Sequence, residues 1–179
     1  MAEQAGEPMR STQDPHGAPE QFTVEQRAAL DVRRADQDRT LAAIHVLEAA
    51  LSSAAPGREG AWRHDVIGAL RDLGEATEEE ERNAAEPDSL LSDIARTQPR
   101  LRNRVRGLRA QYRQVRGTID MLQAELAGDV AHLDAADVRQ RLAWLLGALR
   151  HQRARESDLL YEAYYEAFNR DLERDAQRP

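Results

Sequence analysis

The 179-residue sequence contains no cysteine and no lysine, few aromatic residues and no long apolar run. The absence of cysteine excludes disulfides, cysteine-ligated zinc, iron–sulfur clusters and thiol catalysis. Because aromatic residues make up only 4% of the chain, leucine and alanine carry most of the apolar content, as in bundles packed from helices. No apolar stretch approaches the roughly 18 residues of a membrane span, so we expect no membrane-spanning segment.

The charged residues are unequally divided between the two signs. All 25 basic residues are arginine, against 32 acidic residues, and the formal net charge is −7. A molecule of this charge does not attract nucleic acid or an anionic membrane surface. The first 21 residues contain acids and prolines where a secretory signal needs a basic start and an apolar segment. We therefore expect a cytoplasmic protein that binds neither nucleic acid nor membrane.

Helix-breaking residues divide the sequence into a polar tail and four helical segments. Residues 1–22 include Pro8, Pro15 and Pro19, and their composition predicts a disordered tail. We expect helices over residues 23–53, 58–83, 99–126 and 134–175, with Asp134 as the N-cap of the last. Short connections and one apolar stripe on each helix predict an all-α, up-down-up-down four-helix bundle over residues 23–176.

Each expected helix carries one apolar stripe. The clearest lies in residues 99–126, where spacings of three and four residues alternate and Tyr112 is the one polar member. A bundle of this kind holds a cofactor on polar side chains within its stripes. The stripe residues are Leu30, Leu41, Ile44, Leu47 and Leu51 in the first helix, Trp62, Val66, Leu70 and Leu73 in the second, Leu101, Val105, Leu108, Tyr112, Val115, Ile119, Leu122 and Leu126 in the third, and Leu142, Leu145, Leu146, Leu149, Leu160, Ala163 and Ala167 in the fourth.

Five oxygen-bearing side chains fall on or near the inner faces when residues are placed at 100° per position. They are Glu48, Glu80, Glu81, Tyr112 and Glu156. Together they could hold iron or manganese, as the carboxylates of other helical bundles do. The alternative is that Glu156 pairs with Arg153 or with an arginine of another helix, and that Glu80 and Glu81 lie at a solvated rim. We favour this alternative because the Glu-x-x-His pairs of carboxylate bundles are missing.

The five histidines do not supply a metal site. By helical phase His64 and His151 point outward, and His45 lies at the edge of its stripe. His16 falls in the expected tail and His132 in the loop before the last helix. An exposed histidine on a helix is more often a solvated surface residue than a metal ligand.

One basic and one aromatic cluster bear on possible partners. The arginines at positions 100–116 spread around the third helix, and we interpret them as pairing with acids of neighbouring helices rather than with nucleic acid. Tyr161, Tyr164, Tyr165 and Phe168 gather near the end of the fourth helix. Such a cluster predicts core packing, or a patch for a protein partner if it is exposed.

Two segments resemble the third and fourth helices of bacterial hemerythrin-like (HHE cation-binding) proteins. They are PRLRNRVRGLRAQYRQVRGTIDMLQAEL at 99–126 and LLGALRHQRARESDLLYEAYYEAF at 145–168. The family has a Glu-His pair after L-R-x on its third helix, and here Gln111 and Tyr112 occupy those positions. On the fourth helix Gln152 stands where the family has a histidine. The connecting segments PGREGAW and AEPDSLLSDI add to the likeness, which covers most of residues 25–170.

The resemblance implies a four-helix bundle and a di-iron centre, held by histidines and carboxylates, that senses oxygen, nitric oxide or redox state. In this sequence Tyr112 and Gln152 replace imidazoles, and no histidine accompanies Glu78–Glu81 and Glu86 on the second helix. The loss of nitrogen ligands should weaken iron binding greatly. We therefore expect a degenerate metal site with no bound cofactor.

The expected function is that of a non-enzymatic binding or regulatory module. No glycine-rich phosphate loop, nucleophile elbow or H-E-x-x-H motif occurs in the sequence, and no catalytic residue is assigned. Two alternatives stay open. One is a working iron or manganese protein with oxygen or redox chemistry, and the other is a helical scaffold that binds a protein partner through its tyrosine-rich end.

Overall fold

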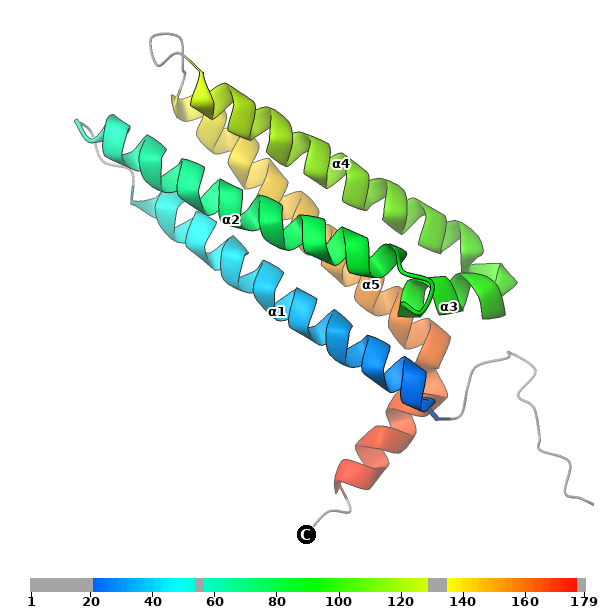
Figure 1. The fold of residues 1–179 in the computed structure, drawn as a ribbon. Coiled ribbons are helices and arrows are strands. Elements are labelled where there is room, and N and C mark those ends of the chain that lie inside the picture. Colours follow the sequence, from blue (N-terminus) through cyan, green and yellow to red (C-terminus); the bar gives the residue numbers. More distant parts are fainter. Residues whose placement is uncertain (1–20, 54–56, 129–134, 177–179) are drawn as a thin grey trace, which may run out of the picture.

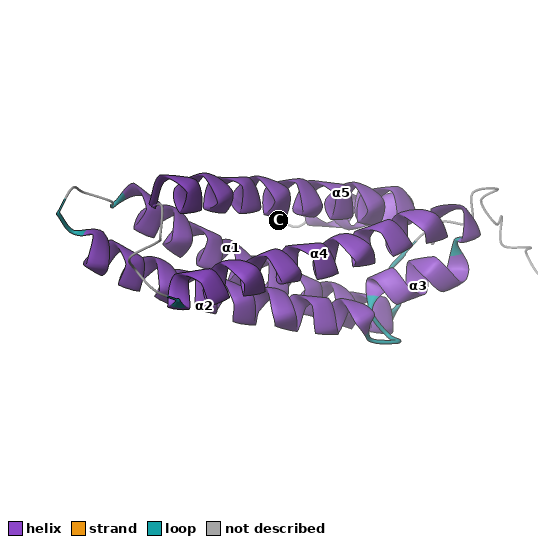
Figure 2. Ribbon diagram, turned by 90° about the horizontal axis from the view of Figure 1, so that it is seen from above, coloured by secondary structure: helices purple, strands orange, loops and turns teal. Residues whose placement is uncertain are grey.

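Four long helices and one short helix form an all-α bundle in the computed structural model, as predicted (Figures 1 and 2). The structure describes residues 21–53, 57–128 and 135–176, without the side chains of residues 174 and 175, and this part of the chain contains no strand. The long helices are α1 (Val24–Ser52), α2 (Glu59–Ala85), α4 (Arg102–Ala127) and α5 (Ala135–Ala176). The short helix α3 (Leu90–Thr97) and a 3-10 turn, η1 (Pro99–Leu101), connect α2 to α4.

Neighbouring long helices run antiparallel, as their contacts show. In each contact a residue from the first half of one helix meets a residue from the second half of its neighbour, and Figure 1 shows the chain reversing direction between successive long helices. The contacts are Asp36–Asn83 between α1 and α2, Arg63–Leu126 between α2 and α4, Arg104–Glu162 between α4 and α5, and Arg27–Asp171 between α1 and α5.

The long helices begin and end within three residues of the predicted positions; the largest difference is at α4, which starts at Arg102 after the 3-10 turn η1. Local signals mark two of these starts. Thr23 Oγ1 accepts a hydrogen bond from Gln26 N, and Gln26 Oε1 accepts one from Thr23 N, which completes a capping box. Pro99 occupies the first turn of η1, where its missing N–H leaves no hydrogen bond unmade. The N-cap predicted at Asp134 lies outside the described residues.

Helix α3 was not expected from the sequence, which we interpreted as a connection at this point. Ser89 caps the helix by accepting a hydrogen bond from Ser92 N at 3.2 Å. Leu90, Leu91 and Ile94 then bury one face of its two turns. A serine cap followed by apolar residues is a helix-start signal, but eight residues are too few for the periodicity to be recognised.

The predicted apolar stripes are buried with two exceptions, both in α1. Leu51 is only partly buried, and Leu41 is 38% exposed, so its assignment to the core is wrong. Thr40 takes the inward position in place of Leu41 and is completely buried. Adjacent helix positions differ by about 100°, so Leu41 is turned towards solvent when Thr40 faces the core.

The interior contains two apolar clusters separated by a layer of polar side chains. One cluster surrounds Leu47, Leu70 and Leu122, in the half of the bundle that contains the start of α2 and the end of α4. The other cluster surrounds Leu108 and Ile94 and includes α3. The layer between them, here called the polar layer, consists of Arg33, Thr40, Thr77, Glu80, Tyr112, Gln152 and Glu156, and takes members from all four long helices.

Helix α5 bends at Tyr164, whose backbone is not helical (φ −123°, ψ 26°). Beyond the bend, the end of α5 leaves the line of the bundle in Figure 1. Phe22 packs against Tyr164 and Phe168 with ring centroids 5.3 and 5.0 Å apart. Phe22 therefore belongs to the core, although we expected it in a disordered tail. Residues 1–20 of that expected tail lie outside the described residues.

Candidate functional site

The guanidinium of Arg33 lies at the centre of the polar layer, between two carboxylates. Its Nη2 donates to Glu156 Oε2, and its Nη1 makes an ion pair with Glu80 Oε1 at 2.9 Å that lacks hydrogen-bond geometry. The three side chains are at most 9% exposed. Arg33 comes from α1, Glu80 from α2 and Glu156 from α5, so the ion pairs join three of the long helices.

The remaining long helix, α4, contributes Tyr112 to the same cluster. The Tyr112 hydroxyl lies 2.9 Å from Glu156 Oε2, to which it donates, and 3.4 Å from Glu80 Oε1. Thr40 Oγ1 donates to the other oxygen of Glu80 at 2.6 Å. Glu80 is thus held through both of its oxygens, whereas Glu156 Oε1 is buried without a hydrogen-bond partner.

Burial and charge shift the pKa values of Glu156, Tyr112 and Arg33. Burial raises the pKa of Glu156, and Glu80 raises it further, while Arg33 opposes the shift. Burial and the negative charge of Glu156 raise the pKa of Tyr112 far above its ordinary value, so the hydroxyl stays protonated and acts as a donor. Burial lowers the pKa of Arg33, but the facing carboxylates outweigh it and the net shift is upward. Arg33 therefore carries a permanent positive charge.

Three of the five residues proposed as metal ligands meet in this cluster, namely Glu80, Tyr112 and Glu156. The other two lie elsewhere. Glu48 is partly buried near the opposite end of α1 and pairs with Arg150. Glu81 lies on a side of α2 where its carboxylate is 3.8 Å from Arg116. A single site built from all five side chains is therefore not formed, because Glu48 lies too far along α1 and Glu81 faces Arg116 on another side of α2.

The sequence reasoning missed Arg33 and Thr40 and placed Gln152 only at the margin of its stripe. Gln152 is 2% exposed, and its Oε1 has no hydrogen-bond partner. Arg33, Thr40 and Leu47 follow one another at seven-residue intervals and are all buried. This heptad spacing was the available signal, but an arginine in a helix is ordinarily taken as a surface residue.

Two of the three described histidines lie as their helical phases predict. His64 and His151 are exposed as predicted, and His45 is exposed rather than at an inner edge. His16 and His132 lie outside the described residues. Among the residues described, no three His, Cys, Asp or Glu side chains come close enough together to hold a metal ion.

Arginines of η1 and α4 pair with acids of adjacent helices, as expected from the sequence. Arg100 and Arg104 share Glu162 of α5, and Arg116 reaches Glu78 of α2 at 3.5 Å. These contacts occupy part of the basic surface of α4 with internal partners.

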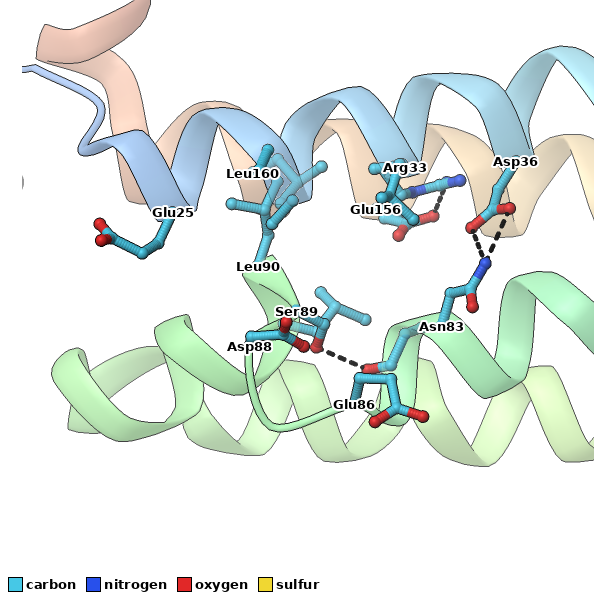
Figure 3. A pocket seen from close by; sticks show the side chains of 15 residues that line it. Glu25, Arg33, Asp36, Asn83, Glu86, Asp88, Ser89, Leu90, Glu156 and Leu160 are labelled. Carbon is cyan, nitrogen blue, oxygen red and sulfur yellow. Dashed lines mark hydrogen bonds and ion pairs between the residues drawn. The ribbon is translucent and has the colours of Figure 1, made fainter.

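A pocket of about 400 Å³ opens beside the polar layer, between α1, the end of α2, α3 and α5 (Figure 3). Arg33 and Glu156 lie at its inner end, and Figure 3 shows them joined there by a dashed line. Apolar side chains, including Leu90, Leu91 and Leu160, line its walls. A volume of this size is within the range of small-molecule sites, roughly 300–1,000 Å³.

A second buried polar contact fastens α3 to the rest of the bundle. Asp93 Oδ2 accepts hydrogen bonds from Tyr164 Oη at 2.7 Å and from Gln26 Nε2 at 2.8 Å, and Arg96 pairs with its Oδ1. Although burial raises the pKa of Asp93, these three partners outweigh it and lower the pKa below its ordinary value. The carboxylate thus links α3 to α1 and α5.

Comparisons with protein-family models, with curated proteins and with solved structures give no match for this chain. The likeness to hemerythrin-like proteins therefore rests on the sequence motifs alone. Within the described ranges, no helix combines the length and apolarity needed to cross a membrane.

Proposed function

We propose that this chain is a hemerythrin-like bundle in which an internal ion-pair cluster stands in place of the metal centre, and that it acts as a non-enzymatic binding or regulatory module in the cytoplasm. The observation that carries the proposal is the Arg33 guanidinium between Glu80 and Glu156. Carboxylate bundles hold their metals in this part of the core, on side chains that project inward from facing helices. The positive charge of Arg33, held between Glu80 and Glu156, takes the place that a metal cation would need between the two carboxylates and repels such a cation.

The state of the other polar groups in the layer also supports a non-enzymatic role. Tyr112 keeps its proton and donates a hydrogen bond to the carboxylate of Glu156. Glu80 is held through both oxygens by Thr40 and Arg33. Groups fixed in this way are suited to holding the four helices in register rather than to exchanging protons with a substrate.

The rival function is that of an iron or manganese protein. It is favoured by the convergence of Glu80, Tyr112 and Glu156, and by the partnerless oxygens of Glu156 and Gln152. These are hard oxygen donors of the kind that manganese and iron accept. For a metal to bind among them, the Arg33 side chain must leave the layer.

Metal analysis decides between the two functions. Protein purified from iron-supplemented cells should contain far less than one iron or manganese per chain and should show no visible absorption band. Two irons per chain, with an oxygen-sensitive visible band, would overturn the proposal.

A protein partner at the tyrosine-rich end of α5 is favoured by a separate observation. Tyr161 and Tyr165 are 50% and 43% exposed, whereas Tyr164 is buried. Truncation before Tyr161 is unsuitable as a test, because it also removes Ala163 and Tyr164 from the core. Replacing Tyr161 and Tyr165 by alanine leaves those core contacts in place and is the sharper variant for binding assays.

A further inference from the structure

The pocket beside the polar layer ends at a buried acceptor that has no partner within the protein. Glu156 is completely buried and lines the pocket, and its Oε1 makes no hydrogen bond. Its other oxygen already accepts from Arg33 and Tyr112. An unpaired buried carboxylate oxygen costs free energy comparable to the desolvation of the group, which a ligand able to donate a hydrogen bond would recover.

The charges around the pocket favour a cation. Five carboxylate side chains line it, against the guanidinium of Arg33 in the lining and that of Arg39, which pairs with Asp36; the carboxylates belong to Glu25, Asp36, Glu86, Asp88 and Glu156. At the inner end the imbalance persists, because Arg33 is shared between Glu80 and Glu156. Two carboxylates and one guanidinium leave one negative charge uncompensated when both acids are ionised.

The walls favour an apolar body on the ligand. Leu90, Leu91 and Leu160 are at most 6% exposed and face the pocket from α3 and α5. Val32 of α1 also lines the pocket and is 49% exposed. Figure 3 shows Leu90 and Leu160 between Glu25 and Glu156. A ligand that reaches Glu156 must therefore lie against apolar side chains along its length.

We propose that this pocket binds a small organic cation, a primary ammonium on an apolar body, with the ammonium donating to Glu156 Oε1 and the body against Leu90, Leu91 and Leu160. The inference deepens the proposed function by naming a ligand class for the binding module, and it rests on that function only in requiring that no metal occupy the layer. An ammonium supplies both the missing donor and the missing positive charge.

The test compares three ligands of the same length and different charge. Hexylammonium, hexanol and hexanoate are titrated into the full chain at neutral pH, where the amine is protonated, and Kd is measured by NMR chemical-shift titration. We expect hexylammonium to bind at least about tenfold more tightly than hexanol, the equivalent of about 1.4 kcal/mol. Hexanoate should bind most weakly, because the carboxylates around the pocket repel it.

Two variants locate the binding. Glu156→Gln keeps an oxygen for Arg33 and Tyr112 but removes the charge, so it should weaken hexylammonium at least about tenfold and leave hexanol unchanged. Ala28→Trp narrows the mouth at an exposed position and should weaken every ligand that binds there. Far-ultraviolet circular dichroism of each variant verifies its helical fold. The Ala28→Trp variant and the three-ligand series keep the test decisive if Glu156→Gln fails to fold.

Three results would overturn the ligand proposal: hexylammonium and hexanol bind equally, hexanoate binds more tightly than hexylammonium, or none of the three binds. An unaltered hexylammonium affinity in Glu156→Gln would also overturn it. None of these results concerns metal content, so the proposed function would stand if the metal analysis remains negative. A metal-loaded protein would refute the proposed function directly, whatever the titrations give.

Discussion

Arg33 is a charged side chain in a position where burial of an ion costs several kcal/mol. Its cost is offset because Glu156 and Glu80 face it from two other helices. Removing one partner from such an arrangement leaves an uncompensated buried charge. The loss of stability is then larger than the net stabilisation that the intact ion pair contributes. The residues of the polar layer are therefore interdependent, and substitutions within it should not be additive.

The raised pKa of Glu156 predicts how stability changes with pH. Because the folded state holds this proton more tightly than the unfolded state, the contribution of Glu156 to the stability of the wild-type protein should fall as the pH rises above 4.5, the ordinary pKa of the group. Glu156→Gln cannot titrate there, so its unfolding free energy should fall less. The difference in unfolding free energy between wild type and Glu156→Gln should change by at most about 1.4 kcal/mol per pH unit.

Urea unfolding at about pH 4 to about pH 7, a range that starts near the ordinary pKa of glutamate, measures the difference in unfolding free energy between the two proteins. A wild-type protein that gains stability relative to Glu156→Gln over this range would show that Arg33 lowers the pKa of Glu156 more than burial raises it.

Residue positions around each helix were largely predictable from the sequence, whereas the partner of the buried carboxylates was not. Helical phase alone places Glu80, Tyr112 and Glu156 inward, and all three are buried. Phase does not say which charges meet across the core, because that depends on the rotation and offset of helices far apart in the sequence. Arg33 and Glu156 are 123 positions apart, and their contact follows only from the packed bundle.

At the scale of elements, α3 makes the α2–α4 connection part of the core. Its apolar face adds Leu90, Leu91 and Ile94 to one apolar cluster. Asp93 on the same helix accepts hydrogen bonds from Gln26 of α1 and Tyr164 of α5. The short helix also forms one wall of the pocket, so its attachment determines the shape of the candidate ligand site.

Asp93→Asn should detach α3 in part. An asparagine at this position cannot accept from Gln26, Tyr164 and Arg96 as a carboxylate does, and hydrogen bonds to charged groups contribute about 1.5–3 kcal/mol. We expect the free energy of unfolding to fall by about 2–3 kcal/mol.

The matched control is Asp72→Asn, on the exposed surface of α2 beside Arg71, which should change stability by less than about 0.5 kcal/mol. Chemical denaturation of the two variants measures the difference. Equal stabilities would contradict the role assigned to Asp93.

The long helices could be predicted from breakers and caps, but the short helix and the bend could not. Thr23 and Pro99 mark helix starts by local chemistry that is visible in the sequence. The bend at Tyr164 has no proline or glycine beside it, and the nearby Glu162, Ala163 and Glu166 are good helix formers. It occurs where Tyr164 packs on Phe22 and bonds to Asp93, contacts that only the tertiary structure creates.

At the scale of the whole molecule, the polar layer divides the interior into two apolar clusters and joins all four long helices. A bundle with only leucine stripes can slide by a turn with little penalty, whereas buried polar groups find partners in one register alone. We infer that the layer fixes the register of the helices, and that it also sets the charge at the inner end of the pocket. Both roles depend on the pairing of Arg33 with the carboxylates.

A double-mutant cycle on Arg33 and Glu156 tests that pairing most directly. Arg33→Met, Glu156→Met and the double variant replace the charges by side chains of similar length, and urea unfolding gives the four free energies. Arg33→Met alone should lose about 3–5 kcal/mol, because it leaves two buried carboxylates unpaired. The double variant should recover part of that loss, with a coupling energy of about 1–3 kcal/mol. Effects that add to within about 0.5 kcal/mol would show that Arg33 and Glu156 do not meet in the core.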